Sequence, residues 1–199
     1  MMMNDVPHAS GKIKVVPITH TASNKIRHWF QDQEVTKYNS HGKLMKPPPD
    51  FDSIDPEKQI IWAVCAELQQ WVSHAPVSAG MEPAGHKHIG NVMLEIDWIN
   101  RSAEFSCIFG EKKYWGKGYA TKAIRQLFEH GFDKLNLHKI WLGTPVTNGA
   151  MAHIAENLGM IEEGMLTDQM FLEGEYVDVA RFGILRSDWG HIKILKEIP

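Results

Sequence analysis

The chain has 199 residues, of which 43% are hydrophobic and 23% are charged, the composition of a globular protein long enough to bury a core. Its net charge of −3 gives no electrostatic attraction to nucleic acid or to an anionic membrane, so neither is expected as a partner. The segment MMMNDVPHAS lacks the regions of a signal peptide, and no apolar run approaches the roughly 18 residues of a membrane-spanning helix. With Cys65 and Cys107 expected to stay reduced, these features predict a cytoplasmic protein of one domain.

The first part of the chain predicts a strand, a helix and a loop, in that order. Residues 12–18 are rich in the β-branched side chains that are typical of strands. Residues 21–38 carry apolar side chains at helical spacing. The prolines of residues 46–56 exclude a helix or a central strand, so this segment is predicted to be a loop.

The middle of the chain predicts strands on either side of an insertion. Residues 58–68 fit a helix or a strand, and their compact apolar run between proline-rich segments favours a buried strand. Residues 69–87 form an insertion that is predicted to be a long loop, of unassigned role. Residues 92–98 and 103–109 each alternate apolar and polar side chains, which predicts an antiparallel hairpin.

Two glycines, Gly116 and Gly118, precede residues 120–135, whose apolar side chains trace one face of a helix. A helix N-terminus offers unpaired N–H donors and the positive end of the helix dipole, and glycine lets a ligand approach the backbone. These properties favour phosphate binding. The alternative is a tight turn in which the glycines only provide positive φ angles.

Two common phosphate-binding loops are excluded by spacing. A Walker A loop needs Ser or Thr after its lysine, and Gly118 follows Lys117 here. The dinucleotide-binding fingerprint needs a third small residue where Thr121 lies. It also needs an acidic residue at the end of the next strand, residues 139–144, and none is present.

The segment YWGKGYATKA resembles the pyrophosphate-binding loop of the GNAT superfamily of N-acetyltransferases, whose pattern is Gln/Arg-x-x-Gly-x-Gly/Ala. Lys113, Gly116 and Gly118 occupy those places, so the first position departs to Lys. Residues 146–160 resemble the second motif of the family. Residues 162–185 resemble the C-terminal hairpin of the branch that contains ribosomal-protein, spermidine and amino-sugar acetyltransferases.

The resemblance covers residues 12–189, and it identifies residues 1–199 as a single acetyltransferase domain. It implies an α+β fold in which a mixed, mostly antiparallel sheet of seven strands is flanked by about four helices. It also implies acetyl-CoA as the cosubstrate, bound between a fourth and a fifth strand that splay apart, with no metal.

The cofactor-binding residues are carried over by position in the family motifs. The backbone of Cys107, Ile108 and Phe109 would pair with the pantetheine arm, much as a peptide adds to a strand edge. Asn148 would bond the same arm, and Asn157 would lie toward the far end of the cofactor. The pyrophosphate would be held by the loop residues Trp115, Gly116, Lys117, Gly118, Tyr119, Ala120 and Thr121.

The catalytic groups of the characterised branches are missing. The ribosomal-protein enzymes carry a serine and a glutamate where this chain has Met151 and Met170. The spermidine enzymes carry a tyrosine where this chain has Ala155. The acceptor amine must still lose a proton, because an alkyl amine is protonated near neutral pH.

Glu104 is the remaining candidate for the catalytic base, since it lies on the predicted hairpin opposite to the apolar side chains. The alternative is a surface carboxylate paired with Arg101. Glu95 and Asp97 project to the same side as Met93 and are candidate substrate-binding residues.

Other polar and aromatic residues have plainer predicted roles. Asp168 and Asp178 either reach an amine or order a turn. His86 and His88 form an H-x-H pair in the predicted loop, without the further ligands that a metal site needs. The tryptophans expected in the core are Trp29, Trp62, Trp98, Trp141 and Trp189, whereas Trp115 is expected to flank the cofactor.

The favoured function is acetyl transfer from acetyl-CoA to a small primary amine, such as the amino group of a nucleotide-linked amino sugar. Such an amine is less basic than an alkyl amine, so a strong base matters less. Lys43 and Lys46, with the insertion, would then meet the phosphates of the substrate. The alternatives are a ribosomal-protein or polyamine acetyltransferase, or a binding module that has lost transfer. The oligomeric state, monomer or homodimer, stays open.

Overall fold

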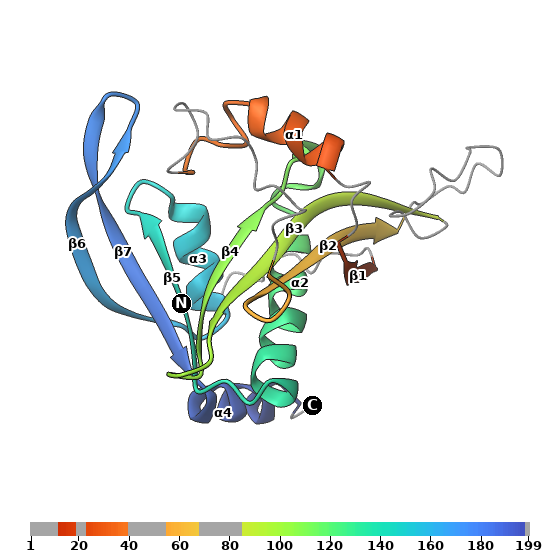
Figure 1. Ribbon diagram of the computed structural model, residues 1–199, viewed down its shortest axis with the longest axis vertical. Coiled ribbons are helices and arrows are strands. Elements are labelled where there is room, and N and C mark those ends of the chain that lie inside the picture. The colour runs from red at the N-terminus through yellow and green to blue at the C-terminus, as the bar shows by residue number, and fades with distance from the viewer. Residues whose placement is uncertain (1–11, 19–22, 40–54, 68–84, 198–199) are drawn as a thin grey trace, which may run out of the picture.

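The structure is a computed structural model that describes residues 12–18, 23–39, 55–67 and 85–197 (Figure 1). Its strands are β1 (Ile13–Pro17), β2 (Gln59–Glu67), β3 (His86–Asp97), β4 (Ser102–Ile108), β5 (Lys139–Pro145), β6 (Ile161–Leu172) and β7 (Glu175–Leu185). Its helices are α1 (Ser23–Gln31), the short 3₁₀ helix η3 (Lys112–Tyr114), α2 (Tyr119–Glu129), the π-helical turn η4 (His130–Lys134), α3 (Gly149–Asn157) and α4 (Arg186–Glu197).

One sheet of seven strands, in the order β1-β2-β3-β4-β5-β7-β6, organises the described residues. All neighbouring strands are antiparallel except β4 and β5, which are parallel. The predicted α+β fold with a mostly antiparallel seven-stranded sheet is therefore confirmed, and so are the first strand, the buried strand β2 and the β3–β4 hairpin.

Two predicted boundaries differ from the structure. The first helix ends at Gln31, and turns follow it, in which the amide of Thr36 donates to the carbonyl of Asp32 over 3.0 Å. The predicted long loop includes His86 and Lys87, which instead belong to β3. Most of residues 46–56 and of the 69–87 insertion lies outside the described residues, as do Lys43 and Lys46.

The main hydrophobic core lies between the sheet and the helices α2, α3 and α4. Phe128 of α2 is its centre, with ring centroids 5.5 Å from Phe105 of β4 and 5.8 Å from Trp189 of α4. All three side chains are almost fully buried. Burying each contributes about 1.5–3 kcal/mol or more of hydrophobic free energy, which fixes α2, and with it the loop at its N-terminus, against β4.

Helix α1 packs on the end of β4 through a second, smaller cluster, formed by Ile26 and Trp29 with Ile108 beside them. The indole of Trp29 lies so close to Gly110 that a Cβ there would come within 2.1 Å of the ring. Only glycine permits this approach, so α1 is held over the point where β4 runs out toward the glycine loop (Figure 1).

The prediction that the tryptophans lie in the core is wrong for two of them. Trp141 of β5 is half-buried and is not part of the core cluster. The second is Trp98. The side chain is 47% exposed, whereas Trp29 and Trp189 are buried. Trp98 follows the last residue of β3, in the turn to β4, where the alternation of the strand no longer applies. Its indole N–H instead donates to the carbonyl of Glu57.

Candidate active site

Strands β4 and β5 start side by side and then separate. Their parallel pairing comprises only Ser102–Lys139, Ala103–Ile140 and Glu104–Trp141. Beyond Glu104 the two strands diverge, as Figure 1 shows from the bottom of the view upward. Within the described residues, the rest of β4 pairs only with β3, so its other edge has backbone groups that are available to an extended ligand. The splay that the resemblance implied is therefore present.

The glycine loop lies between the end of β4 and the start of α2. Gly116 and Gly118 have φ angles of 67° and 75°, in the left-handed region. Gly118 is the N-cap of α2, and no side chain caps this end. The first turn of a helix leaves its N–H groups without intrahelical acceptors. The loop therefore presents donors at the positive end of a helix dipole, a geometry that suits an anionic group.

The surroundings of the glycine loop also suit the binding of an anionic group. A Cβ at Gly116 would meet no atom within 4 Å, so the space beside the backbone is open. Trp115, Lys117 and Gly116 are exposed. The indole N–H of Trp115 donates to the carbonyl of Phe109 over 2.7 Å, which ties the loop to the residue that follows β4. Tyr119, Ala120 and Thr121, in the first turn of α2, are half-buried.

Residues 107–109, predicted to pair with pantetheine through their backbone, lie at the end of β4 beside this loop. Their side chains are half-buried. Burial raises the pKa of the Cys107 thiol to about 12, so the thiol stays protonated near neutral pH and is a poor nucleophile. No disulfide joins it to Cys65.

Asn148 and Asn157 lie at opposite ends of α3. Asn148 is the N-cap, and its side-chain oxygen accepts a hydrogen bond of 3.3 Å from the amide of Met151. That bond uses one side-chain acceptor and leaves the amide donors of Asn148 for another partner. Asn157 is half-buried in the last turn.

Glu104 occupies the point at which β4 and β5 part. Its side chain lies on the face of the sheet opposite to Phe105, in register with Glu95 on β3 and with Trp141 on β5. Glu104 as a whole is exposed, but partial burial of its carboxyl, and then the charge of Glu95, raise the pKa of the carboxyl, while the charge of Arg181 lowers it. A raised pKa makes a carboxylate a stronger base near neutral pH.

Arg181 is the site residue that sequence reasoning missed. It lies on β7, and its guanidinium carbon is 3.9 Å from the ring centroid of Trp141. The cation that acts on Glu104 is thus Arg181. Arg101, its partner in the alternative interpretation, lies in the β3–β4 turn with a φ of 50°. Nothing in the sequence pairs Arg181 with Glu104, because β5 lies between their strands.

The other acidic candidates have structural partners. Both oxygens of Asp97 accept hydrogen bonds from Asn100, at 3.0 and 2.6 Å, and these bonds lower its pKa. Asp97 therefore orders the β3–β4 turn. Asp178 accepts a hydrogen bond of 2.9 Å from the amide of Asp168, so these two residues order the β-bulge of β6 against β7 and not a turn.

The histidine pair lies at the start of β3. His88 is buried, with its ring centroid 4.8 Å from that of Trp29. Among the described residues, no three histidine, cysteine or acidic side chains come together as ligands for a metal ion. Within the same part of the chain, no helix has the length and apolar character needed to cross a membrane.

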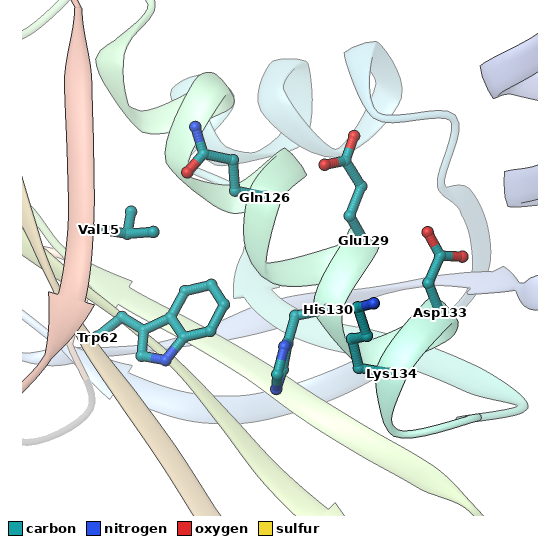
Figure 2. Close-up of a pocket in the computed structure, with 7 residues that line it drawn as sticks. All are labelled: Val15, Trp62, Gln126, Glu129, His130, Asp133 and Lys134. Atoms are coloured by element: carbon teal, nitrogen blue, oxygen red, sulfur yellow. The ribbon is translucent and has the colours of Figure 1, made fainter.

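A separate open cavity of about 380 Å³ lies between α2 and the strands β1 and β2. Figure 2 shows Trp62 of β2 facing His130 of η4, whose ring centroids are 5.0 Å apart. The other lining residues are Val15, Gln126, Glu129, Asp133 and Lys134. None of the predicted site residues lines this cavity, so it is distinct from the β4–β5 splay.

The family model of the acetyltransferase (GNAT) domain matches residues 12–161. The chain belongs to the GNAT family. The match spans the β4–β5 splay and the glycine loop, so the geometry described above is that of a GNAT domain. The match includes the first two of the three motifs, and it confirms the resemblance to this family.

Among characterised GNAT proteins, the chain is similar to spermidine N(1)-acetyltransferases. It is 41% identical to that of Vibrio cholerae over 110 residues, which are 55% of this chain and 63% of the relative. It is 35% identical to that of Escherichia coli K12 over 97 residues, which are 49% and 52% of the two chains. It is also 30% identical to a putative ribosomal N-acetyltransferase of Bacillus subtilis over 94 residues, 47% and 51% of the two chains. The matches thus span about half to two-thirds of these relatives.

A solved structure extends the similarity in fold. The crystal structure of spermidine N-acetyltransferase from Vibrio cholerae in complex with CoA and spermine superposes with a TM-score of 0.70 at 28% identity. The match covers 89% of this chain and 97% of that one.

Proposed function

We propose that this protein is an acetyl-CoA-dependent N-acetyltransferase that acts on a small primary amine. The observation that carries the proposal is the pair of left-handed glycines at the uncapped N-terminus of α2, beside the β4 edge that β5 leaves. A pyrophosphate suits the helix N-terminus, and an amide-containing pantetheine arm suits the strand edge. The relative with bound CoA supports the same cosubstrate.

The residues assigned to acetyl-CoA fit this ligand. The amides of residues 115–121 would hold the pyrophosphate, the backbone of residues 107–109 would pair with pantetheine, and Asn148 would donate to the same arm. Holding the thioester against the amine supplies much of the rate, because it replaces a bimolecular encounter.

Glu104 is the proposed base. In the reaction the amine nitrogen forms a C–N bond to the acetyl carbonyl carbon and the C–S bond to CoA breaks. The proton lost by the amine passes to Glu104, directly or through water, and the departing thiolate of CoA takes up a proton from solvent. The raised pKa of Glu104 supports this role, since a base works best when its pKa approaches the working pH.

For the acceptor, we propose a polyamine-like cation in preference to the amino sugar favoured from the sequence. Glu95 and Glu104 lie directly opposite each other on neighbouring strands, and like charges in such a pair repel. A cationic amine placed between them would remove that repulsion. The spermidine acetyltransferases among the relatives support the same substrate class.

The test is the release of free CoA thiol over a panel of amines: spermidine, spermine, an amino-sugar nucleotide and a peptide with a free N-terminus. The proposal expects kcat/KM for a polyamine to exceed the others by an order of magnitude. A larger kcat/KM for the amino-sugar nucleotide or the peptide would show that the proposed substrate class is wrong. Acetyl-CoA binding without turnover of any amine would instead identify a binding module.

A further inference from the structure

The face of the sheet around Glu104 carries an unusual set of charges. Glu95 lies on one side of Glu104, in register across β3 and β4. Trp141 lies on the other side, across the short parallel pairing of β4 and β5. Arg181 comes from β7 and covers the Trp141 ring, with its guanidinium carbon 3.9 Å from the ring centroid. The indole thus holds the cation on the side of Glu104 away from Glu95.

Two further charged residues near Glu104, Lys139 and Asp97, have other partners. Lys139, two residues before Trp141 on β5, forms an ion pair of 2.6 Å with Glu163 of β6. The absence of a side chain at Gly183 makes this pairing possible, because a Cβ there would lie 2.5 Å from the Glu163 carboxylate. Asp97, two residues after Glu95 on β3, accepts hydrogen bonds from Asn100. Lys139 is therefore engaged elsewhere, and Arg181 is the cation that acts on Glu104.

We infer that Arg181 is a positioning residue for the reaction: its stacked guanidinium keeps Glu104 ionised, and so able to accept a proton, in spite of the neighbouring Glu95. The effect of Arg181 on the rate of acetyl transfer rests on the proposed function. The electrostatic part concerns Glu104 and Arg181 alone. A planar guanidinium suits the position because it stacks on an indole and stays charged at every pH of interest.

The sign of the effect follows from the charges. Burial and Glu95 both favour the protonated form of Glu104, and Arg181 favours the ionised form. Removing the cation raises the pKa of Glu104, so less of the base is ionised at acidic pH. Activity then falls in the acidic limb of the pH profile, and no such loss is expected on the alkaline side, where Glu104 is ionised in either protein.

The test compares Arg181→Met and Arg181→Lys with the unmodified protein. Arg181→Met keeps an extended side chain without the charge, and it is expected to lower kcat/KM about fivefold in the acidic limb, the upper end of the effect of a screened interaction between partly exposed charges. Arg181→Lys keeps the charge and is expected to restore most of that loss. The matched control is Arg125→Met, because Arg125 also stacks on an indole, that of Trp189, but lies in α2 away from Glu104. This control should leave the profile unchanged.

A second measurement separates the inference from the proposed function. Carbon-13 NMR of the Glu104 carboxyl, without any substrate, should show its titration midpoint at higher pH in Arg181→Met than in the unmodified protein. An unchanged midpoint overturns the inference, whether or not the protein turns over amines. A loss of activity that is equal at all pH values, and equal in the Met and Lys variants, also overturns it. A shifted midpoint in a protein that acetylates no amine leaves the inference standing and removes the proposed function.

Discussion

Replacing Gly118 by Val tests whether the glycine loop holds the pyrophosphate. Gly118 has φ 75° and ψ 5° at the N-cap of α2, a conformation that a β-branched residue adopts only under strain. The strain costs about 1–3 kcal/mol, which lowers Tm by about 2–12 °C in a chain of this size. If the backbone relaxes to a negative φ instead, the loop amides no longer converge on one point. Losing two N–H bonds to a phosphate, at about 1.5 kcal/mol each, weakens acetyl-CoA binding about 100-fold.

The assay is isothermal titration calorimetry of acetyl-CoA, together with thermal unfolding of each variant. The matched control is Gly174→Val in the β6–β7 turn. Gly174 also has a left-handed φ, of 98°, and a Cβ there would meet no atom within 4 Å. The control should therefore lose a similar amount of stability and bind acetyl-CoA normally.

The result that would refute the reasoning is a folded Gly118→Val protein that binds acetyl-CoA as tightly as the unmodified chain. The pyrophosphate would then lie away from the N-terminus of α2. An equal loss of affinity in the Gly174→Val control would also refute it, because the effect would then come from general destabilisation.

Three further outcomes are expected. Glu104→Gln should lower turnover about 10²-fold, and full activity would remove Glu104 from the mechanism. At neutral pH the same variant should raise Tm, because burial raises the pKa of this carboxyl in the fold and stability is lost as pH rises from the ordinary pKa through the raised one. Asn148→Ala should lower the free energy of unfolding in urea by about 1 kcal/mol, since it removes the cap on the Met151 amide. Unchanged acetyl-CoA affinity in this variant would contradict the proposed bond between Asn148 and pantetheine. Burial, and then the charge of Lys134, lower the pKa of His130. The free energy of unfolding should therefore fall as pH drops below 6.5, the ordinary pKa of histidine, and His130→Gln should flatten that dependence. An unchanged slope would show that another group is responsible.

Local pattern in the sequence was enough to predict most elements and the glycine loop before α2. The alternation in residues 92–98 and 103–109 reports which side of a strand is buried, and the spacing behind Gly118 reports the buried face of α2. Both signals arise within a few residues, so they survive without tertiary information. The same holds for the left-handed glycines, because few other residues adopt that conformation.

The surroundings of Glu104 were decided by the tertiary structure. Its neighbours Glu95, Trp141 and Arg181 come from three other strands, and the alternation of a single strand does not specify strand order or register. The sequence therefore determined that the Glu104 side chain lies on the face of the strand opposite to the core. The registers of β3, β4, β5 and β7 placed one carboxylate and one stacked cation around it, and the tertiary structure left Trp98 in an exposed turn.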